Sequence, residues 1–162
     1  MLNTEALAEQ LGQALLARGQ SVTTAESCTG GLIAGAITDV AGSSNWFNRG
    51  FVTYSNSAKV DMLDVPPGFI QGLGAVSEPV VAAMVQGAMA ASSADWGIAV
   101  SGVAGPGGGS ADKPVGTVWF AWGSPLGIVT ERCVFAGDRR EVRQQAVAHA
   151  LGKLVQLIKE SR

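Results

Sequence analysis

A strand, a polar turn and a helix follow one another in residues 20–40, and this unit constrains the fold more than any other segment. Residues 20–24 (QSVTT) are rich in β-branched side chains, which favour a strand. The turn at residues 26–31 (ESCTGG) carries an acid, hydroxyls, a thiol and two glycines. Apolar residues then recur at a spacing that suits one face of a helix: Leu32, Ile33, Ala36, Ile37 and Val40. The segment predicts a strand–turn–helix unit with polar groups at the turn.

Strand and helix signals alternate along the rest of the chain. Asn3 or Thr4 caps a first helix that ends at Gly19, and Asp138 with Glu141 forms a capping box at the start of the last helix. Further elements are predicted as strands at residues 46–54, 96–100, 115–122 and 128–135, and as helices at residues 54–62 and from Ser77 onward. Alternating elements with one late hairpin predict an α/β fold, a three-layer α/β/α sandwich with a mixed, mostly parallel sheet. Residues 1–162 are expected to form a single domain.

Composition narrows the class of protein. Of the 162 residues, 47% are apolar and only 15% are charged, which is typical of a folded globular protein. The net charge of −2, without any block of like charges, argues against a nucleic-acid partner. Cys28 and Cys133 have no metal-ligand spacing, and a reduced intracellular chain is the simpler interpretation. Without a signal peptide or a long apolar run, we expect a cytoplasmic protein with no membrane partner.

Several common motifs are absent. Residues 105–110 do not form a dinucleotide fingerprint, because Ser110 occupies the last glycine position, and there is no phosphate-binding loop of the Gly-Lys-Ser/Thr type. No serine lies in a Gly-x-Ser-x-Gly elbow. His149 is the only histidine, so neither a histidine-based zinc site nor a Ser-His triad is expected. A catalytic serine in this chain would need another base.

Ser27 and Lys59 are the candidate nucleophile and base. Ser27 lies at the mouth of the first turn, where N–H groups at a helix start suit a phosphate or an oxyanion; alternatively, Ser27 or Thr29 simply caps the helix. A desolvated lysine can accept a proton, because burial lowers its pKa. Lys59 follows an aromatic strand, with Tyr54 nearby to orient it or relay a proton; a solvated surface lysine is the alternative. Lys113 is a rival base or an anion contact.

Two further features favour an anionic ligand. The glycine-rich loop at residues 105–109 can present backbone N–H groups to an anion, or it can be a loose surface loop. Arg139 and Arg140 lie at a helix start, where cations oppose the helix dipole, so a nearby anion or solvation must compensate them. Glu26 could hold Lys59 or a substrate amide, or it could complement the helix start.

These residues resemble the CinA C-terminal domain family. The resemblance is carried by blocks that occur in the family's order and span nearly the whole chain: residues 26–31 (ESCTGG), 50–59 (GFVTYSNSAK), 74–78 (GAVSE), 101–109 (SGVAGPGGG) and 113–118 (KPVGTV). The resemblance is to the stand-alone form, since the chain is too short for the molybdopterin-binding-like domain of longer CinA proteins. It implies the three-layer fold and nicotinamide-nucleotide amidase activity. That reaction converts nicotinamide mononucleotide and water into nicotinate mononucleotide and ammonia in pyridine-nucleotide recycling.

The resemblance also implies a Ser/Lys amidase without a metal or a cofactor. Ser27, Tyr54 and Lys59 match the family's active-site blocks, and Ser44 and Ser101 match further polar positions. The family commonly has Thr where this chain has Ser101. The expected mechanism has Ser27 attack the carboxamide carbon while neutral Lys59 takes its proton.

Further groups are assigned to the substrate in this hypothesis. Backbone N–H groups of Thr29, Gly30 and Gly31 stabilise the oxyanion, and the ribose or phosphate is held by Ser101, Gly105, Gly107, Gly108, Arg139 and Arg140. In a variant of the mechanism, Ser27 positions the amide while Ser44 or a water attacks. A non-catalytic nucleotide- or phosphate-binding module and an amidase for another small amide stay open as alternatives. Apolar helix faces and the late hairpin make a homo-oligomer a further expectation.

Overall fold

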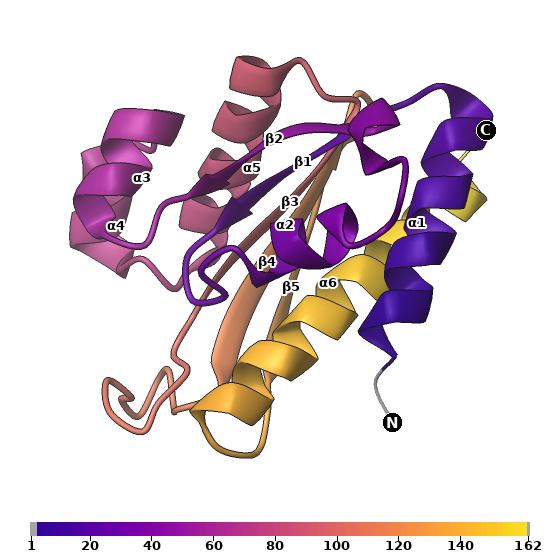
Figure 1. Ribbon diagram of the computed structural model, residues 1–162. Helices are drawn as coiled ribbons and strands as arrows, with labels where there is room; N and C mark the ends of the chain where they lie inside the picture. Colours follow the sequence, from indigo (N-terminus) through magenta and orange to yellow (C-terminus); the bar gives the residue numbers. More distant parts are fainter. Residues whose placement is uncertain (1–2, 162) are drawn as a thin grey trace.

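A computed structural model describes residues 3–161, which fold around one five-stranded sheet in the order β2-β1-β3-β4-β5 (Figure 1). The strands are β1 (Val22–Glu26), β2 (Phe47–Val52), β3 (Trp96–Gly102), β4 (Thr117–Ser124) and β5 (Gly127–Val134). The pairs β1–β2 and β1–β3 are parallel, whereas β3–β4 and β4–β5 are antiparallel. Only β4 runs against the others, which confirms the mixed, mostly parallel sheet.

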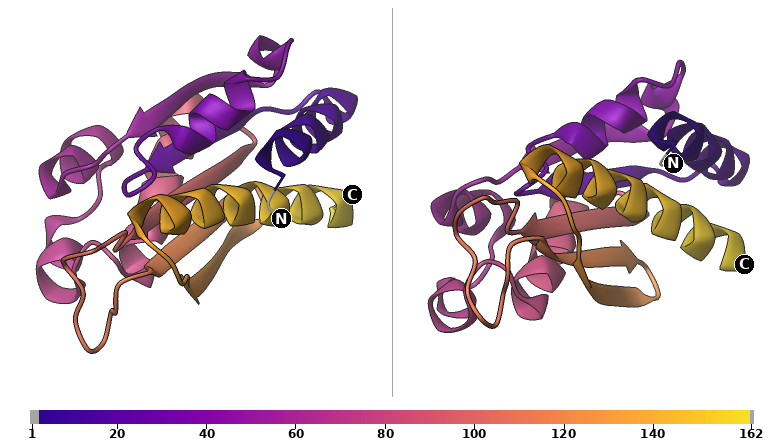
Figure 2. Two further views of the ribbon diagram at one scale, coloured as in Figure 1. Left: turned by 60° about the horizontal axis from the view of Figure 1, so that its bottom comes forward. Right: turned by 90° about the horizontal axis from the view of Figure 1, so that it is seen from below.

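Helices cover both faces of this sheet (Figure 2). One face carries α1 (Thr4–Arg18), α2 (Leu32–Thr38) and α6 (Arg139–Glu160), and a short 3-10 helix, η1 (Ser43–Asn45), precedes β2. The other face carries α3 (Asn56–Leu63), α4 (Pro67–Leu73) and α5 (Glu78–Ser92). The three-layer α/β/α prediction is therefore confirmed. None of the helices within residues 3–161 is both long and apolar enough to cross a bilayer.

Each face of the sheet has its own apolar core, because successive strand residues point in opposite directions. Ile98, Phe120 and Trp122 pack toward α1, α2 and α6, whereas Ala99 and Ala121 pack toward α5. Small residues on the second face allow α5 to lie close to the sheet. A Cβ atom on Gly97, for example, would come within 2.8 Å of Val85. Burial on both faces explains why these strands read as nearly continuous apolar runs.

The structure confirms the capping residues predicted at the ends of α1 and at the start of α6. The Asn3 side chain accepts a hydrogen bond from Ala6 N, and Gly19 ends α1 in the left-handed conformation. Asp138 and Glu141 form the predicted capping box of α6.

Other boundaries differ from the prediction. The helix predicted from Ser77 onward is α5, which begins at Glu78, although the Ser77 hydroxyl donates to Gly74 O and makes no capping hydrogen bond. Pro67 starts the unpredicted helix α4, where proline at the first turn lacks only an N–H that would have no partner in the helix. Ser101 and Gly102 are paired in β3 and do not belong to the loop that follows.

The carboxyl ends of β1, β2 and β3 meet at one edge of the sheet, because these strands are parallel. Three connections leave from this edge: the turn after Glu26, the segment from Thr53 to α3, and the glycine-rich loop after Gly102. The glycine-rich loop extends beside the amino end of α6 (Figures 1 and 2). In α/β sheets this edge is the usual place for a ligand site.

Candidate active site

Ser27 stands at the first position after β1, on a tight turn. Its N–H donates to Val100 O of β3 at 3.0 Å, and Gly30 N donates back to Ser27 O at 3.0 Å. Positive φ angles of 57° at Gly30 and 104° at Gly31 let the chain turn directly into α2. The side chain of Ser27 is nearly buried and lines an open cavity of about 330 Å³. Hydrogen bonds from both the N–H and the carbonyl of Ser27 thus fix the position of its main chain.

Glu26 complements the start of α2 from inside the fold. Its fully buried carboxylate accepts hydrogen bonds from the Thr29 hydroxyl at 2.6 Å and from backbone N–H groups of Ile33 at 2.9 Å, Ala34 at 3.0 Å and Gly31 at 3.3 Å. Of the three roles open to Glu26 from sequence, these contacts support the last. The negative charge is balanced by the positive end of the helix dipole.

This arrangement corrects the predicted substrate contacts of the turn. The Gly31 amide donates to Glu26, the Gly30 amide donates to Ser27 O, and the Thr29 hydroxyl also binds Glu26. The amides of Gly30 and Gly31 are therefore engaged within the protein, whereas the contribution of the Thr29 amide to the oxyanion site stays a prediction. Within residues 3–161, the amides of Cys28 and Thr29 have no such hydrogen-bonded acceptor.

Lys59 is buried with its amine against Ser27. The side chain is 1% exposed, and Nζ lies 2.9 Å from Ser27 Oγ. Nζ also donates to three backbone carbonyls, those of Thr53 at 2.9 Å, Tyr54 at 3.3 Å and Ser55 at 3.4 Å. Burial lowers the pKa of Lys59 from 10.5 to about 8. The alternative of a solvated surface lysine is wrong.

The first turn of α3 and the end of β2 deliver Lys59 to this place. The Ser55 hydroxyl accepts from Ala58 N and caps α3, and Thr53 N donates to Glu26 O at 2.9 Å, which extends the β1–β2 pairing. Lys59 follows within the first turn of the helix, so its side chain reaches back over the end of β1. Ser27 and Lys59 are 32 positions apart in the sequence, and the parallel pairing of β1 with β2 brings them together.

Tyr54 contacts Lys59 through its backbone carbonyl. Its carbonyl oxygen accepts from Lys59 Nζ and, at 3.4 Å, from Ser27 Oγ. Its phenol is 60% exposed and accepts a hydrogen bond from Arg139 at 3.0 Å. The structure thus orients Lys59 through the backbone of Tyr54, and the phenol stands at the mouth of the cavity.

The glycine-rich loop forms the opposite wall of the cavity. Ser101, Gly105, Gly107 and Gly108 line it together with Ser27, Cys28, Tyr54 and Lys59. Ser101 is 1% exposed at the end of β3. Arg139 anchors the loop by donating to Gly105 O at 2.9 Å. These residues are brought together as the sequence predicts.

Arginines from the first turns of α6 line a second, adjoining cavity of about 850 Å³. Arg139, Arg140 and Arg143 contribute to it, and Arg139 also lines the smaller cavity. Arg143 was not predicted as a site residue. It donates to Cys28 O at 3.0 Å and to Thr29 O at 3.4 Å, so it holds the turn that carries Ser27. Its position one helical turn after Arg139 is a signal that could have found it.

Cys28 is a small buried residue in this structure. Its side chain is 6% exposed, and burial raises the pKa of its thiol from 9.0 to about 11. A thiol with this pKa is protonated at neutral pH and is a poor nucleophile. These properties support a packing role for Cys28 and argue against a reactive thiol.

Two candidates lie elsewhere. Ser44 is exposed in η1, three residues before β2, at the amino ends of the parallel strands, whereas Ser27 follows the carboxyl end of β1. The prediction that Ser44 joins the site within this chain is corrected, because the strands separate the two serines. Lys113 Nζ donates to Leu73 O and tethers the segment after the glycine-rich loop to α4, and Lys113 does not line the cavity at Ser27.

The sequence profile of the CinA C-terminal domain matches residues 4–158. The chain belongs to the CinA C-terminal domain family. The nicotinamide-nucleotide amidohydrolase PncC of Escherichia coli K12 is 59% identical over 151 residues, which cover 93% of this chain and 92% of that protein. The protein of the same name from Pseudomonas putida is 58% identical over 151 residues, with coverage of 93% and 94%.

Solved structures of CinA proteins confirm the fold. The competence damage-inducible protein A of Klebsiella pneumoniae superposes with a TM-score of 0.96 at 42% identity, over 99% of both chains. The competence/damage inducible protein CihA of Agrobacterium tumefaciens gives 0.93 at 46% identity, over 95% of this chain and 94% of that one. The resemblance drawn from the sequence blocks is confirmed.

Proposed function

We propose that the chain hydrolyses the carboxamide of nicotinamide mononucleotide to nicotinate mononucleotide and ammonia, as a nicotinamide-nucleotide amidase of pyridine-nucleotide recycling. Relatives of this name share 59% and 58% of their aligned residues with the chain. The observation that carries the proposal is the buried pair of Ser27 and Lys59, with Oγ and Nζ 2.9 Å apart. An amine next to a hydroxyl, with a pKa lowered to about 8, has the properties of a general base for serine.

In the proposed reaction, neutral Lys59 takes the proton of the Ser27 hydroxyl as Oγ attacks the carboxamide carbon. The resulting tetrahedral intermediate collapses to an acyl-enzyme, and the departing ammonia receives its proton from the Lys59 ammonium. Neutral Lys59 then takes a proton from water, and the hydroxide attacks the acyl carbon. The ester bond to Ser27 breaks, Oγ receives the proton from the Lys59 ammonium, and nicotinate mononucleotide is released. The carbonyls of Thr53, Tyr54 and Ser55 point at Nζ and hold the ammonium that forms after each proton transfer.

For the oxyanion, we propose the backbone N–H of Cys28. It belongs to the residue directly after the nucleophile, which is where serine hydrolases of other folds also take an oxyanion donor. The later amides of Gly30 and Gly31 are engaged within the turn. One such donor is worth about 3 kcal/mol of transition-state stabilisation.

In this proposal, the two adjoining cavities bind different parts of the substrate. The carboxamide lies in the smaller cavity at Ser27, and the 5′-phosphate lies toward Arg139, Arg140 and Arg143 in the larger one. Guanidinium groups suit phosphate because they offer several donors in a planar fork. Arg139 lines both cavities and contacts the Tyr54 phenol, so it stands where ribose would pass between them.

Ammonia release from nicotinamide mononucleotide by the purified protein tests this proposal. Free nicotinamide and the Ser27→Ala protein serve as controls. We expect release from the nucleotide only, lost by at least about 1,000-fold in Ser27→Ala, since covalent and acid–base catalysis depend on that oxygen. Residual turnover near wild type would contradict the nucleophile. Binding of the nucleotide without turnover would favour a binding module, and turnover of another amide would change the substrate.

We also propose that residues 1–162 form one domain and that the protein works in the cytoplasm. The proposed substrate carries a phosphate, and a charged group of this kind does not cross a bilayer unaided. A homo-oligomer stays a prediction. Strand β5 at the edge of the sheet exposes Ile128, Val129 and Val134, and light scattering on the purified protein would measure the mass.

A further inference from the structure

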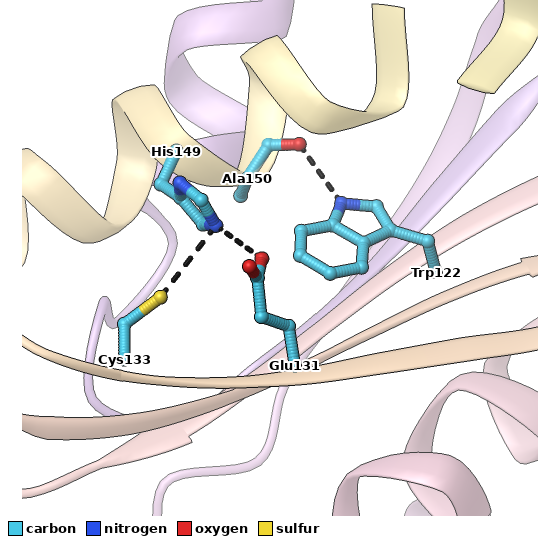
Figure 3. A network of polar contacts seen from close by, with 5 residues as sticks. All are labelled: Trp122, Glu131, Cys133, His149 and Ala150. Carbon is cyan, nitrogen blue, oxygen red and sulfur yellow. Dashed lines mark hydrogen bonds and ion pairs between the residues drawn. The ribbon is translucent and has the colours of Figure 1, made fainter. Parts of the chain in front are cut away.

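Three side chains of different chemistry meet between β5 and α6 (Figure 3). Glu131 and Cys133 lie on β5, and His149 lies on α6. His149 Nε2 is 2.6 Å from Glu131 Oε1 and 3.6 Å from Cys133 Sγ. The three potential ligand atoms all lie within 4.8 Å of one another. Each residue is partly exposed, so an ion in solution can reach the cluster.

The geometry does not suit a thiol–imidazole–carboxylate relay. A relay uses both ring nitrogens of histidine, one toward the nucleophile and the other toward the acid. Here a single nitrogen, Nε2, faces both the thiol and the carboxylate (Figure 3). Three donor atoms that converge on one point are what a metal ion requires.

The sulfur–nitrogen spacing fits a tetrahedral zinc ion. Zinc–sulfur and zinc–nitrogen bonds of usual length place the two donor atoms about 3.6 Å apart, which matches the distance between Cys133 Sγ and His149 Nε2. The nitrogen–oxygen distance would be about 3.4 Å, so the Glu131 carboxylate must move by less than 1 Å from its hydrogen bond, roughly a small side-chain rotation. Thiolate, imidazole and carboxylate are all ligands that zinc accepts.

The imidazole is held in place by aromatic packing. Its ring centroid lies 4.9 Å from that of Phe120 and 5.9 Å from that of Trp122. Trp122 is itself fixed by a hydrogen bond from its indole N–H to Ala150 O at 3.0 Å (Figure 3). Glu131 pairs with Phe120 and Cys133 with Val118 across β4, so both ligands on β5 face α6. The cluster therefore stands on rigid elements, as a metal site needs.

We propose that Glu131, Cys133 and His149 bind one zinc ion, with the fourth position open to solvent. The site joins the edge strand β5 to α6. It is separate from the cavity at Ser27, whose lining contains none of the three residues. The sequence did not reveal it, because the spacing of the ligands along the chain follows no zinc motif and the pairing of β5 with α6 arises only in the folded protein.

Metal analysis of the purified full-length protein tests the proposal. After exposure to zinc and dialysis against metal-free buffer, we expect one zinc per chain. Cobalt in place of zinc should give a thiolate-to-cobalt charge-transfer band in the near ultraviolet, with the visible bands of a tetrahedral ion. Zinc should also raise the midpoint of thermal unfolding, because a ligand bound only by the folded state stabilises it.

Conservative variants assign the ligands. Cys133→Ser, His149→Gln and Glu131→Gln should each weaken zinc binding by at least about 100-fold, since loss of even an outer-shell partner costs about 10–100-fold. Cys28→Ala, which removes the other thiol, is the matched control and should retain the zinc and the charge-transfer band. Wild-type protein without bound zinc or without the cobalt–thiolate band overturns the proposal, and this outcome does not depend on whether any variant folds. A band that survives in Cys133→Ser but is lost in Cys28→Ala also overturns it.

Discussion

The pKa of Lys59 predicts the pH dependence of the proposed amidase. With a pKa of about 8, the neutral amine makes up about 10% of Lys59 at pH 7, about half at pH 8 and about 90% at pH 9. Because kcat/KM reports the free enzyme, it should rise about tenfold from pH 7 to pH 9 and then level off. The substrate phosphate, with a second pKa of about 6, is already ionised over this range. Ammonia release at low substrate concentration, measured from pH 6.5 to 9.5, gives the profile.

Lys59→Arg is the matched variant for this experiment. Arginine keeps the positive charge and the hydrogen-bonding ability, but it cannot give up its proton at these pH values. We expect kcat/KM to fall by at least about 100-fold, the usual contribution of a general base. A flat wild-type profile, or a Lys59→Arg protein that retains its activity, would refute the base role. Lys59 would then act as a fixed cation.

Three further predictions follow from buried contacts of the site. Folding lowers the pKa of Lys59 from 10.5 to about 8, so the unfolded chain binds more protons than the folded protein between these pH values. From pH 8 to pH 10.5 the free energy of unfolding of the wild-type protein should therefore rise by up to about 3 kcal/mol relative to that of Lys59→Met, as measured by urea unfolding. Glu26→Gln should destabilise the fold by about 2 kcal/mol, because the NH2 group of the new glutamine must face one of the backbone N–H donors. Glu9→Gln, at an exposed position, is the control, and an equal loss of stability in both variants would contradict the reasoning. Arg143→Met should lower kcat/KM by about 100-fold with little loss of stability, because the Ser27 turn loses its outer support; unchanged kinetics would show that the turn holds itself.

The sequence predicts local structure well where a few neighbouring residues determine it. Asp138 and Glu141 identify the start of α6, and Gly19 identifies the end of α1, because caps depend on only a few neighbouring residues. Ser27 and Lys59 were also predicted, from the elimination of histidine chemistry and from the family blocks. The distance of 2.9 Å between Ser27 Oγ and Lys59 Nζ could not be predicted from their spacing in the sequence, because it depends on the register of β1 with β2.

The errors have a common physical cause. We expect from the sequence that the amides of Thr29, Gly30 and Gly31 bind an oxyanion, but Gly31 donates to Glu26 and Gly30 donates to Ser27 O within the protein. A sequence does not reveal whether a helix start is satisfied by a ligand or by a side chain of the same chain. Arg143 and the phenol of Tyr54 depend in the same way on how α6 packs beside the turn, which is a long-range contact.

Two side chains hold the turn that carries Ser27: Glu26 accepts from the N–H groups of Gly31 and Ile33, and Arg143 donates to the carbonyls of Cys28 and Thr29. Its conformational entropy is therefore lost when the protein folds, and little is left to lose when a substrate arrives. Binding should then order few groups in the nucleophile turn, and hydrogen exchange at the amides of Ile33 and Ala34 should be slow with or without a ligand. The nucleophile turn is therefore preorganised and does not close around the substrate. Its selectivity rests on the shape and charge that the site already has in the free protein.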